Sequence, residues 1–326
     1  MKRQQSGNGL VKFIVTLALI VGAAWLVLNR QAVSDWWRLI QYKPTPEIQQ
    51  LVDSDTMQGR GRDLFYASEP QIQAGADFNT ACSKQGEQTI VLGCYKAQRI
   101  YLYNVTDAKL GGVKEVTAAH EMLHAVYERL STADRDRVNA MLQPIIADMK
   151  DQRIVELIQL YNREEPGELY NEMHSILGTE YAELTPDLEA YYRQYFGDRI
   201  KIVGYARQYQ AVFTDSKAKL DSYDQQLDTL KSQIDGNNNS LKQQQLGLES
   251  TAVELTELRS SGRIQEYNQQ VPVYNVKVES FNTLVEQTKA LVEQYNSLVA
   301  ERNQQATAQN DLYQSLDSHY QPVSQN

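Results

Sequence analysis

The chain has 326 residues, a formal net charge of −9 at pH 7 and only two cysteines. The acidic balance, with no cluster of Lys and Arg beyond the N-terminal tip, argues against nucleic acid or an anionic surface as the main partner. The sequence has no glycine-rich phosphate loop and no convincing serine or cysteine nucleophile, which disfavours nucleotide-dependent and covalent catalysis.

Residues 10–29 are predicted to form a transmembrane anchor. Almost every residue from 13 to 28 is apolar, and with snorkelling cations at its ends this stretch reaches the roughly 17–25 residues that a span needs. The net positive charge before the stretch exceeds that after it. The positive-inside rule therefore places the tip, residues 1–9, in the cytoplasm and everything after Arg30 outside.

Residues 30–45 form a juxtamembrane segment, in which Trp36 and Trp37 suit the outer membrane–water interface. A cleavable signal peptide is the competing interpretation, although the apolar stretch is long for one and no Ala-x-Ala site follows it. Both interpretations export the rest of the chain. The anchor interpretation makes it a single-pass cell-membrane protein with its main domain outside.

Two strands, over residues 89–95 and 99–105, are predicted with a short polar turn between them. Cys82 and Cys94 suit one disulfide in an oxidising compartment. Such a bridge would tie the loop before the first strand to that strand and stabilise the fold by about 2–3 kcal/mol. A cysteine metal site is disfavoured because no second cysteine pair exists.

Residues 113–130 are predicted to form one helix, which contains the sequence His-Glu-Met-Leu-His. Residues four apart share a helix face, so His120 and His124 can present two imidazoles to one metal ion. Glu121 follows the first histidine, where its carboxylate can reach a metal-bound water and act as general base. Zinc suits two imidazoles and one carboxylate with a fourth position open. A structural pair of histidines on a buried helix is the alternative.

This motif resembles that of the zincin metallopeptidases. The metzincin branch would need Gly at 127 and His at 130, and it is excluded because the chain has Tyr127 and Leu130. The segment around Glu172 and Ser175 is similar to the Asn-Glu-x-x-Ser-Asp segment of thermolysin-like peptidases and the Glu-x-x-Ala-Asp segment of membrane-bound gluzincins. The resemblance spans about residues 110–180 and implies a zinc peptidase of gluzincin type with Glu172 as the third ligand.

The chain departs from those families at Ile176, where both have Asp, so the partner that orients the histidines is not identified. Glu180 is the alternative third ligand, although it lies where the helix is expected to end, beyond Gly178. His174 points elsewhere on the helix than Glu172. We expect it to support the ligands, to donate to a transition-state oxyanion, or to be a partly buried histidine with a backbone partner.

The fold class expected for residues 46–203 is α+β, a mainly helical zincin-like catalytic domain with a small hairpin or sheet. Helices are predicted over 132–149, capped by Ser131, and over 151–163, and another starts at Thr185-Pro186. In zincins the strand before the motif helix often lines the cleft, so residues 99–105 are expected to pair with an extended substrate.

Residues 204–318 are predicted to form a long antiparallel coiled-coil hairpin, followed by a tail at 319–326. Two arms meet at Ser260-Ser261-Gly262, and the helix is expected to continue through Gly236 and past Pro272. Apolar residues recur every seven positions, at Phe213, Leu220, Leu227, Ile234, Leu241, Leu248 and Leu255, then at Ile264, Val271, Val278, Val285, Val292 and Val299. The hairpin is either a spacer or self-association rod, or an arm that contacts a substrate or partner.

The leading hypothesis is a membrane-anchored, exported zinc metallopeptidase that hydrolyses peptide bonds in a peptide or protein substrate. His120, His124 and Glu172 would hold the ion, and Glu121 would take the proton of the metal-activated water. The alternative is a non-enzymatic cell-envelope scaffold or adhesion protein with a structural zinc site and a coiled-coil interaction arm. The presence of Glu121 argues against this alternative, because a structural site does not need that carboxylate.

Overall fold

The computed structural model describes residues 7–82 and 90–319 of the chain. Its contacts divide the chain into two compact units. The N-terminal unit runs to Val212 and takes in the chain again from Leu312, and the hairpin unit is Phe213–Asp311. Most of the predicted cytoplasmic tip and nearly all of the predicted tail lie outside the described residues.

Helix α1 (Gly7–Leu28) is the predicted N-terminal apolar helix. Its window Val11–Leu28 is long and apolar enough to cross a membrane, and none of that window is buried in the structure. A helix that is apolar on all sides needs an apolar environment around it. The helix is therefore confirmed, and its retention as an anchor stays a prediction.

Four short helices follow: α2 (Arg30–Gln41), α3 (Pro46–Ser54), α4 (Gly59–Ala67) and α5 (Gly75–Cys82). Helix α2 begins two residues after α1 ends and packs against α4. Helix α3 starts where Thr45 accepts a hydrogen bond from the Ile48 N–H and Pro46 occupies the first helical position. The sequence did not predict these helices. Helices α3, α4 and α5 have only eight or nine residues and show no clear period, and α2 lies in the stretch expected to be a juxtamembrane segment.

The sheet has three strands in the order β1-β3-β2: β1 (Gln71–Gln73), β3 (Arg99–Tyr103) and β2 (Gly93–Lys96). Strands β2 and β3 form the predicted antiparallel hairpin, although residue 89 of the predicted range lies outside the described residues. The turn is made by Ala97 and Gln98, whose φ angles are 50° and 61°. Two positive φ angles in a two-residue loop match the twist of the strands. Strand β1 pairs in parallel with β3.

The expected pairing of residues 99–105 with substrate is wrong, because β3 is the central strand of the sheet. Both of its edges are occupied, by β1 and β2, so among the described residues the strand next to the motif helix whose outer edge has no strand partner is β2. The Tyr103 N–H donates to the Leu92 carbonyl at 2.8 Å. Antiparallel alternation then turns the backbone groups of Cys94 toward β3 and those of Gly93 and Tyr95 outward.

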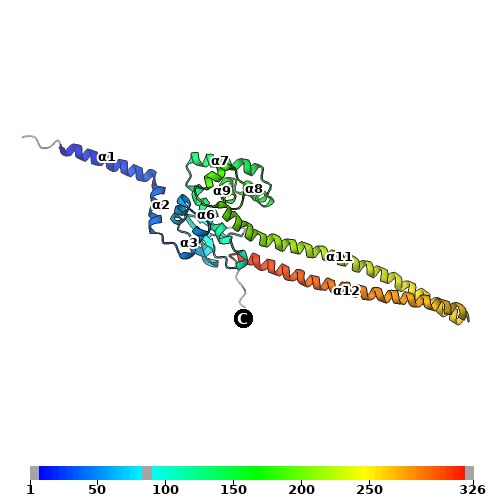
Figure 1. Cartoon of the computed structure of the whole chain (residues 1–326). Helices are drawn as coiled ribbons and strands as arrows, with labels where there is room; N and C mark the ends of the chain where they lie inside the picture. The colour runs from blue at the N-terminus through cyan, green and yellow to red at the C-terminus, as the bar shows by residue number, and fades with distance from the viewer. Residues whose placement is uncertain (1–6, 83–89, 320–326) are drawn as a thin grey trace, which may run out of the picture. The chain divides into compact units, whose positions relative to one another are not determined.

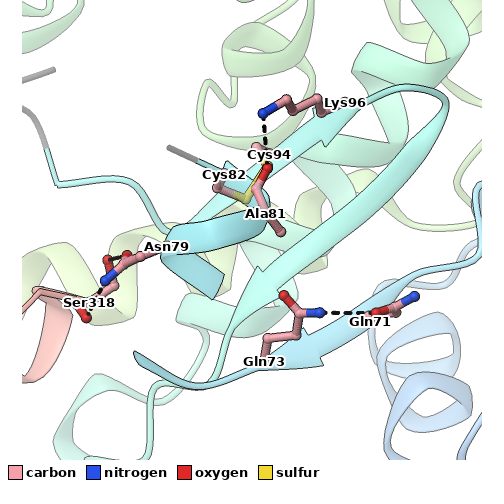
Figure 2. Close-up of a disulfide and its surroundings, with 8 residues drawn as sticks. All are labelled: Gln71, Gln73, Asn79, Ala81, Cys82, Cys94, Lys96 and Ser318. Atoms are coloured by element: carbon pink, nitrogen blue, oxygen red, sulfur yellow. Dashed lines mark hydrogen bonds between the residues drawn. A yellow bond between two sulfur atoms is a disulfide. The ribbon is translucent and has the colours of Figure 1, made fainter. Parts of the chain in front are cut away.

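Figure 2 shows the predicted disulfide between Cys82 and Cys94, which is confirmed. Cys82 is the last residue of α5 rather than part of a loop, so the bridge ties a helix to the edge strand. On the same helix Asn79 exchanges two hydrogen bonds with Ser318, at 2.8 and 2.6 Å (Figure 2). Helix α5 is therefore fixed both to β2 and to the segment that follows α12.

Two helices that pack along one another form the centre of the N-terminal unit: α6 (Val113–Glu128), which follows the short 3-10 turn η1 (Ala108–Leu110), and α9 (Leu169–Thr179) (Figure 1). A Cβ built on Gly178 would lie 2.4 Å from Leu123 Cδ1 of α6, so this glycine permits the close approach. Helix α9 continues through Gly178 and ends at Thr179, with Glu180 as its C-cap residue, where the end was expected. The motif helix is found as predicted.

The remaining helices of this unit are α7 (Thr132–Ala147), α8 (Gln152–Glu164) and α10 (Pro186–Tyr192). They match the predicted helices, and Ser131 and Thr185 are N-caps as expected. The sheet and helices enclose one apolar core. Its fully buried members include Phe65, Ile100, Leu102, Ala119, Met122, Leu123, Leu142, Met173, Leu177, Tyr192 and Tyr195.

The hairpin unit is formed by most of α11 (Arg199–Ser260) and α12 (Ile264–Leu316), which pack together and meet at a turn (Figure 1). Gly262 has a φ of 78° there, a conformation that glycine adopts without strain. The helices continue through Gly236 and Pro272 as predicted. Of the apolar residues predicted to recur every seven positions, Leu255 is buried, whereas Ile264 and Val292 are 50% and 39% exposed.

Candidate metal centre

His120 and His124 lie one helical turn apart on the inner side of α6. Their Nε2 atoms face one another at 3.0 Å. The two side chains are 17% and 14% exposed, so an ion or a small molecule can still reach them. The helix period alone places the two rings together, as the sequence predicts.

Glu172 approaches the two rings from α9. Its Oε1 lies 3.4 Å from His120 Nε2, and its Oε2 lies 3.6 Å from His124 Nε2. The ligand atoms of the three residues all lie within 4.8 Å of one another, so the group can hold a metal ion. A tetrahedral zinc ion with ligands at about 2.0–2.1 Å separates them by about 3.3 Å. The donor atoms and their spacing therefore fit zinc.

Asn171 orients the second histidine, and sequence analysis missed it. Its Oδ1 lies 3.0 Å from His124 Nδ1, and its Nδ2 donates to Glu168 Oε2 at 3.0 Å. Because an amide oxygen only accepts, this contact places the proton of His124 on Nδ1 and leaves the Nε2 lone pair toward His120 Nε2, where it can bind a metal ion. The available signal was its position directly before Glu172, in the Asn-Glu pair of the similar segment.

Tyr161 supports the third residue from helix α8. Its hydroxyl donates a hydrogen bond to the Glu172 carboxylate, which favours the charged form of that carboxylate. Nothing in the local sequence identifies this tyrosine, since it lies on another helix and its contact depends on tertiary packing. Asn171 and Tyr161 together hold one imidazole and one carboxylate in fixed orientations.

The charges of the group are unequal. At His120, burial disfavours the charged ring, but the hydrogen bond and charge of Glu172 outweigh burial and raise the pKa to about 9. At His124, burial and the neighbouring His120 lower the pKa to about 4. Burial disfavours the charged form of Glu172 too, but His120 lowers its pKa to about 2. The negatively charged Glu172 carboxylate is thus balanced by the proton on His120. A metal cation could take the place of that proton.

Glu121 extends from α6 to the outer edge of β2. It is 5% exposed, and its carboxylate accepts a hydrogen bond from the Tyr95 backbone N–H. Burial raises the pKa of Glu121 to about 7, His120 opposes the rise and Glu172 adds to it. Gly93 makes this arrangement possible, since a Cβ there would lie 2.9 Å from Glu121 Oε1.

The other two candidates lie apart from this group. Glu180 follows the end of α9, where Arg153 pairs with its carboxylate at 2.7 Å and Gln210 donates to it at 2.8 Å. The structure therefore does not place Glu180 among the metal-binding residues. His174 is fully buried, and its Nε2 shares a hydrogen bond of 2.9 Å with the Tyr191 hydroxyl. This ring has no surface from which to reach a substrate, so it has no part in the mechanism proposed below.

Comparisons with known protein families, with curated proteins and with solved structures find no match to this chain. The interpretation therefore depends on the geometry alone. The site combines two imidazoles, a buried carboxylate that completes a metal group, and a second carboxylate of nearly neutral pKa beside them. Such a set can bind a Lewis acid and move a proton in the same place.

Proposed function

We propose that this protein is a membrane-anchored, exported zinc metallopeptidase of gluzincin type. The observation that carries the proposal is the position of Glu121, beside the His120, His124 and Glu172 group and under the outer edge of β2. A structural metal site needs no such carboxylate. When bound, the zinc ion would polarise a water molecule and the carbonyl of the substrate.

The residues of the chain have distinct roles in this proposal. His120, His124 and Glu172 hold the ion, and Asn171 keeps the His124 proton on Nδ1 so that Nε2 is free to bind. The Glu121 carboxylate accepts the proton of the attacking water and then donates it to the departing amine. Burial raises the pKa of this carboxyl, which favours its holding the proton between the two transfers.

An extended peptide is the substrate that the sheet edge favours. Gly93 and Tyr95 direct their backbone groups outward along β2. The Tyr95 N–H is occupied by Glu121, which leaves the Tyr95 carbonyl and the backbone of Gly93 to pair with a substrate strand. A bound peptide would then pass directly over the Glu121 carboxylate.

The proposed location is the outer face of the cell membrane. Helix α1 is long and apolar enough to span it, and the Cys82–Cys94 disulfide suits an oxidising compartment. Retention of α1 as an anchor with a cytoplasmic N-terminus follows from the charge distribution around it. Protease treatment of intact cells should digest the part of the chain that follows α1, and protection of that part would contradict this topology.

An envelope scaffold is the second candidate, and the hairpin unit favours it. The hairpin holds no member of the candidate metal group, and its buried residues include Leu230, Leu255 and Leu258 of its two packed helices. In that reading the hairpin would bind a partner or a second copy of the chain, and the zinc would be structural. The two candidate functions differ in the role of Glu121. A peptidase needs its carboxylate for catalysis, whereas a scaffold needs it only for the fold.

The deciding experiment compares Glu121→Gln with Glu180→Gln in the full chain, purified with its membrane helix and assayed on a peptide library. Both substitutions neutralise one carboxylate, but only Glu121 adjoins the candidate metal group. We expect wild type and Glu180→Gln to bind about one zinc and cleave peptides. Glu121→Gln should keep the zinc and lose at least about a hundred-fold in turnover.

Unchanged turnover in Glu121→Gln would exclude the mechanism. Zinc binding without cleavage in wild type would favour the scaffold. Glu172→Ala should weaken zinc binding by about ten-fold or more, because two imidazoles alone leave the ion under-coordinated. Retention of zinc in that variant would move the third ligand elsewhere.

A further inference from the structure

Helix α2 turns its polar side toward the protein and its apolar side away from it. An amphipathic helix of a water-soluble domain has the opposite arrangement, with the apolar stripe against the core. Helix α2 follows α1 after a single intervening residue, Asn29. The reversed arrangement therefore occurs at the point where the chain would leave a membrane.

The polar side of α2 is bound to the N-terminal unit by side-chain contacts. Gln31 accepts a hydrogen bond from Gln98 Nε2 at 2.6 Å, and Arg38 donates to the Gln98 carbonyl at 2.9 Å. Asp35 accepts two hydrogen bonds of 2.8 Å from Arg129, whose side chain is only 4% exposed. At 100° per residue, the three α2 residues lie within about 60° of one another on the helix.

The apolar side carries Trp36, Trp37 and Ile40, which are 60%, 58% and 59% exposed. On the helix these residues are centred about 180° from the polar contacts. Large apolar side chains that gather on one exposed face of a helix indicate an apolar partner. Tryptophan at the end of an apolar span is typical of the membrane–water interface, because its ring is apolar and its N–H can reach water.

The chain connection identifies the partner. Trp36 comes eight residues after Leu28, the end of the apolar window. A straight continuation of α1 would place it about 12 Å past the hydrocarbon edge, beyond a headgroup layer only about 5–7 Å thick. A helix that turns to lie along the surface keeps all three apolar side chains in that layer.

We propose that α2 lies in the outer headgroup layer of the bilayer, with Trp36, Trp37 and Ile40 among the lipids and the N-terminal unit on its polar side. The contact is made by apolar and aromatic side chains, so it requires no anionic lipid. This agrees with the net charge of −9, which disfavours an anionic surface.

One consequence rests on the proposed peptidase function. Arg129, which binds Asp35, ends the helix that carries Glu121 and also donates to the Tyr95 hydroxyl at 2.7 Å. Eight residues of helix separate Glu121 from Arg129, about 12 Å. The candidate site is therefore held near the lipid surface, and its substrates would be peptide segments that lie close to the bilayer, such as the membrane-proximal parts of other membrane proteins.

Tryptophan fluorescence tests the lipid contact independently of any activity. The chain has three tryptophans, at 25, 36 and 37, so Trp25→Phe leaves only the two of α2. The full-length variant is placed in phosphatidylcholine vesicles with iodide on both sides, or with lipids brominated near the headgroup. The matched control lacks all three tryptophans and carries Val253→Trp, at a hairpin position that is 60% exposed.

We expect iodide to quench the α2 tryptophans at least about three-fold less than the control, and brominated lipid to quench only the α2 tryptophans. Iodide quenching equal to the control would overturn the proposal. Protection from both iodide and brominated lipid would also overturn it, because a protein would then cover this face. Neither result depends on zinc or on peptide cleavage, so failure here is distinct from failure of the proposed function.

Discussion

The two units of this chain are stabilised in different ways. In the N-terminal unit, charged and polar groups are buried and paired over long distances in sequence, as with Arg129 and Asp35, which are 4% and 15% exposed. In the hairpin unit the corresponding pair, Arg302 and Asp224, is 36% and 50% exposed. The two ion pairs are therefore expected to differ in how much each contributes to the stability of its unit.

The largest expected change in the free energy of unfolding comes from breaking these two ion pairs, one in each unit. We expect Arg129→Ala to destabilise the N-terminal unit by about 3–5 kcal/mol, because Asp35 would stay partly buried without its partner. Arg302→Ala should leave the free energy of unfolding nearly unchanged, since its pair is in contact with solvent. Chemical denaturation followed by tyrosine circular dichroism measures both. Equal losses would remove the distinction between the units.

A glycine in the N-terminal unit, Gly61, gives a second test of how tightly that unit is packed. A Cβ built on Gly61 would lie 2.5 Å from the Tyr195 carbonyl oxygen and 2.9 Å from Tyr195 Cα. Because both atoms belong to the backbone, Gly61→Ala should destabilise the N-terminal unit by about 1–3 kcal/mol, even though alanine favours a helix. The free energy of unfolding is the measurement. A gain in stability would mean that α4 moves easily.

Asp55 gives the N-terminal unit a pH dependence. It is fully buried, and neither carboxylate oxygen has a hydrogen-bond partner in the described part of the chain. Burial and Glu115 raise the pKa of Asp55 well above its usual 3.8, and Lys201 only partly opposes them. The folded state thus binds this proton more tightly than the unfolded state, so stability falls as pH rises above about 4.

The substitution Asp55→Asn removes that titration. We expect the variant to match wild type in stability near pH 4 and to be more stable than wild type at pH 7. Thermal unfolding across this pH range measures the effect. A difference that does not change with pH would show that Asp55 is ionised in the fold.

The smallest expected effect is a gain in the hairpin. Gly236 lies inside α11, and a Cβ there would meet nothing within 4 Å. Gly236→Ala should therefore stabilise the hairpin unit by about 0.5–1 kcal/mol, because alanine loses less backbone entropy in a helix. Amide hydrogen exchange within Phe213–Asp311 should slow. Faster exchange would indicate that the glycine has a role other than as a helical residue.

The sequence predicts those features whose partners are set by local spacing. His120 and His124 share a helix face by period, and the seam residues Leu248 and Leu255 follow a repeat of seven. The cysteine pairing follows from there being only two cysteines. Glu172 required the resemblance to known peptidases, because nothing local relates it to the histidines.

Features set by tertiary packing were not predictable. Tyr161 belongs to another helix than Glu172, and the Tyr95 N–H reaches Glu121 only because β2 is the edge strand. The position of β3 at the sheet centre depends on β1, a three-residue strand too short to show alternation. The orientation of helix α2 was not predicted, because only its polar contacts in the structure show that its apolar side points away from the protein.

Gly93 links the edge strand to the proposed base in a way that bears on how the gene can vary. A Cβ there would lie 2.5 Å from Thr117 Cγ2 and 2.9 Å from Glu121 Cγ. Every missense change of a glycine codon introduces a Cβ, so each amino-acid replacement at this position must displace either the strand or the two α6 side chains. We therefore expect few amino-acid replacements at position 93 to be neutral. The distance between β2 and the Glu121 carboxylate should stay the same wherever this glycine is kept.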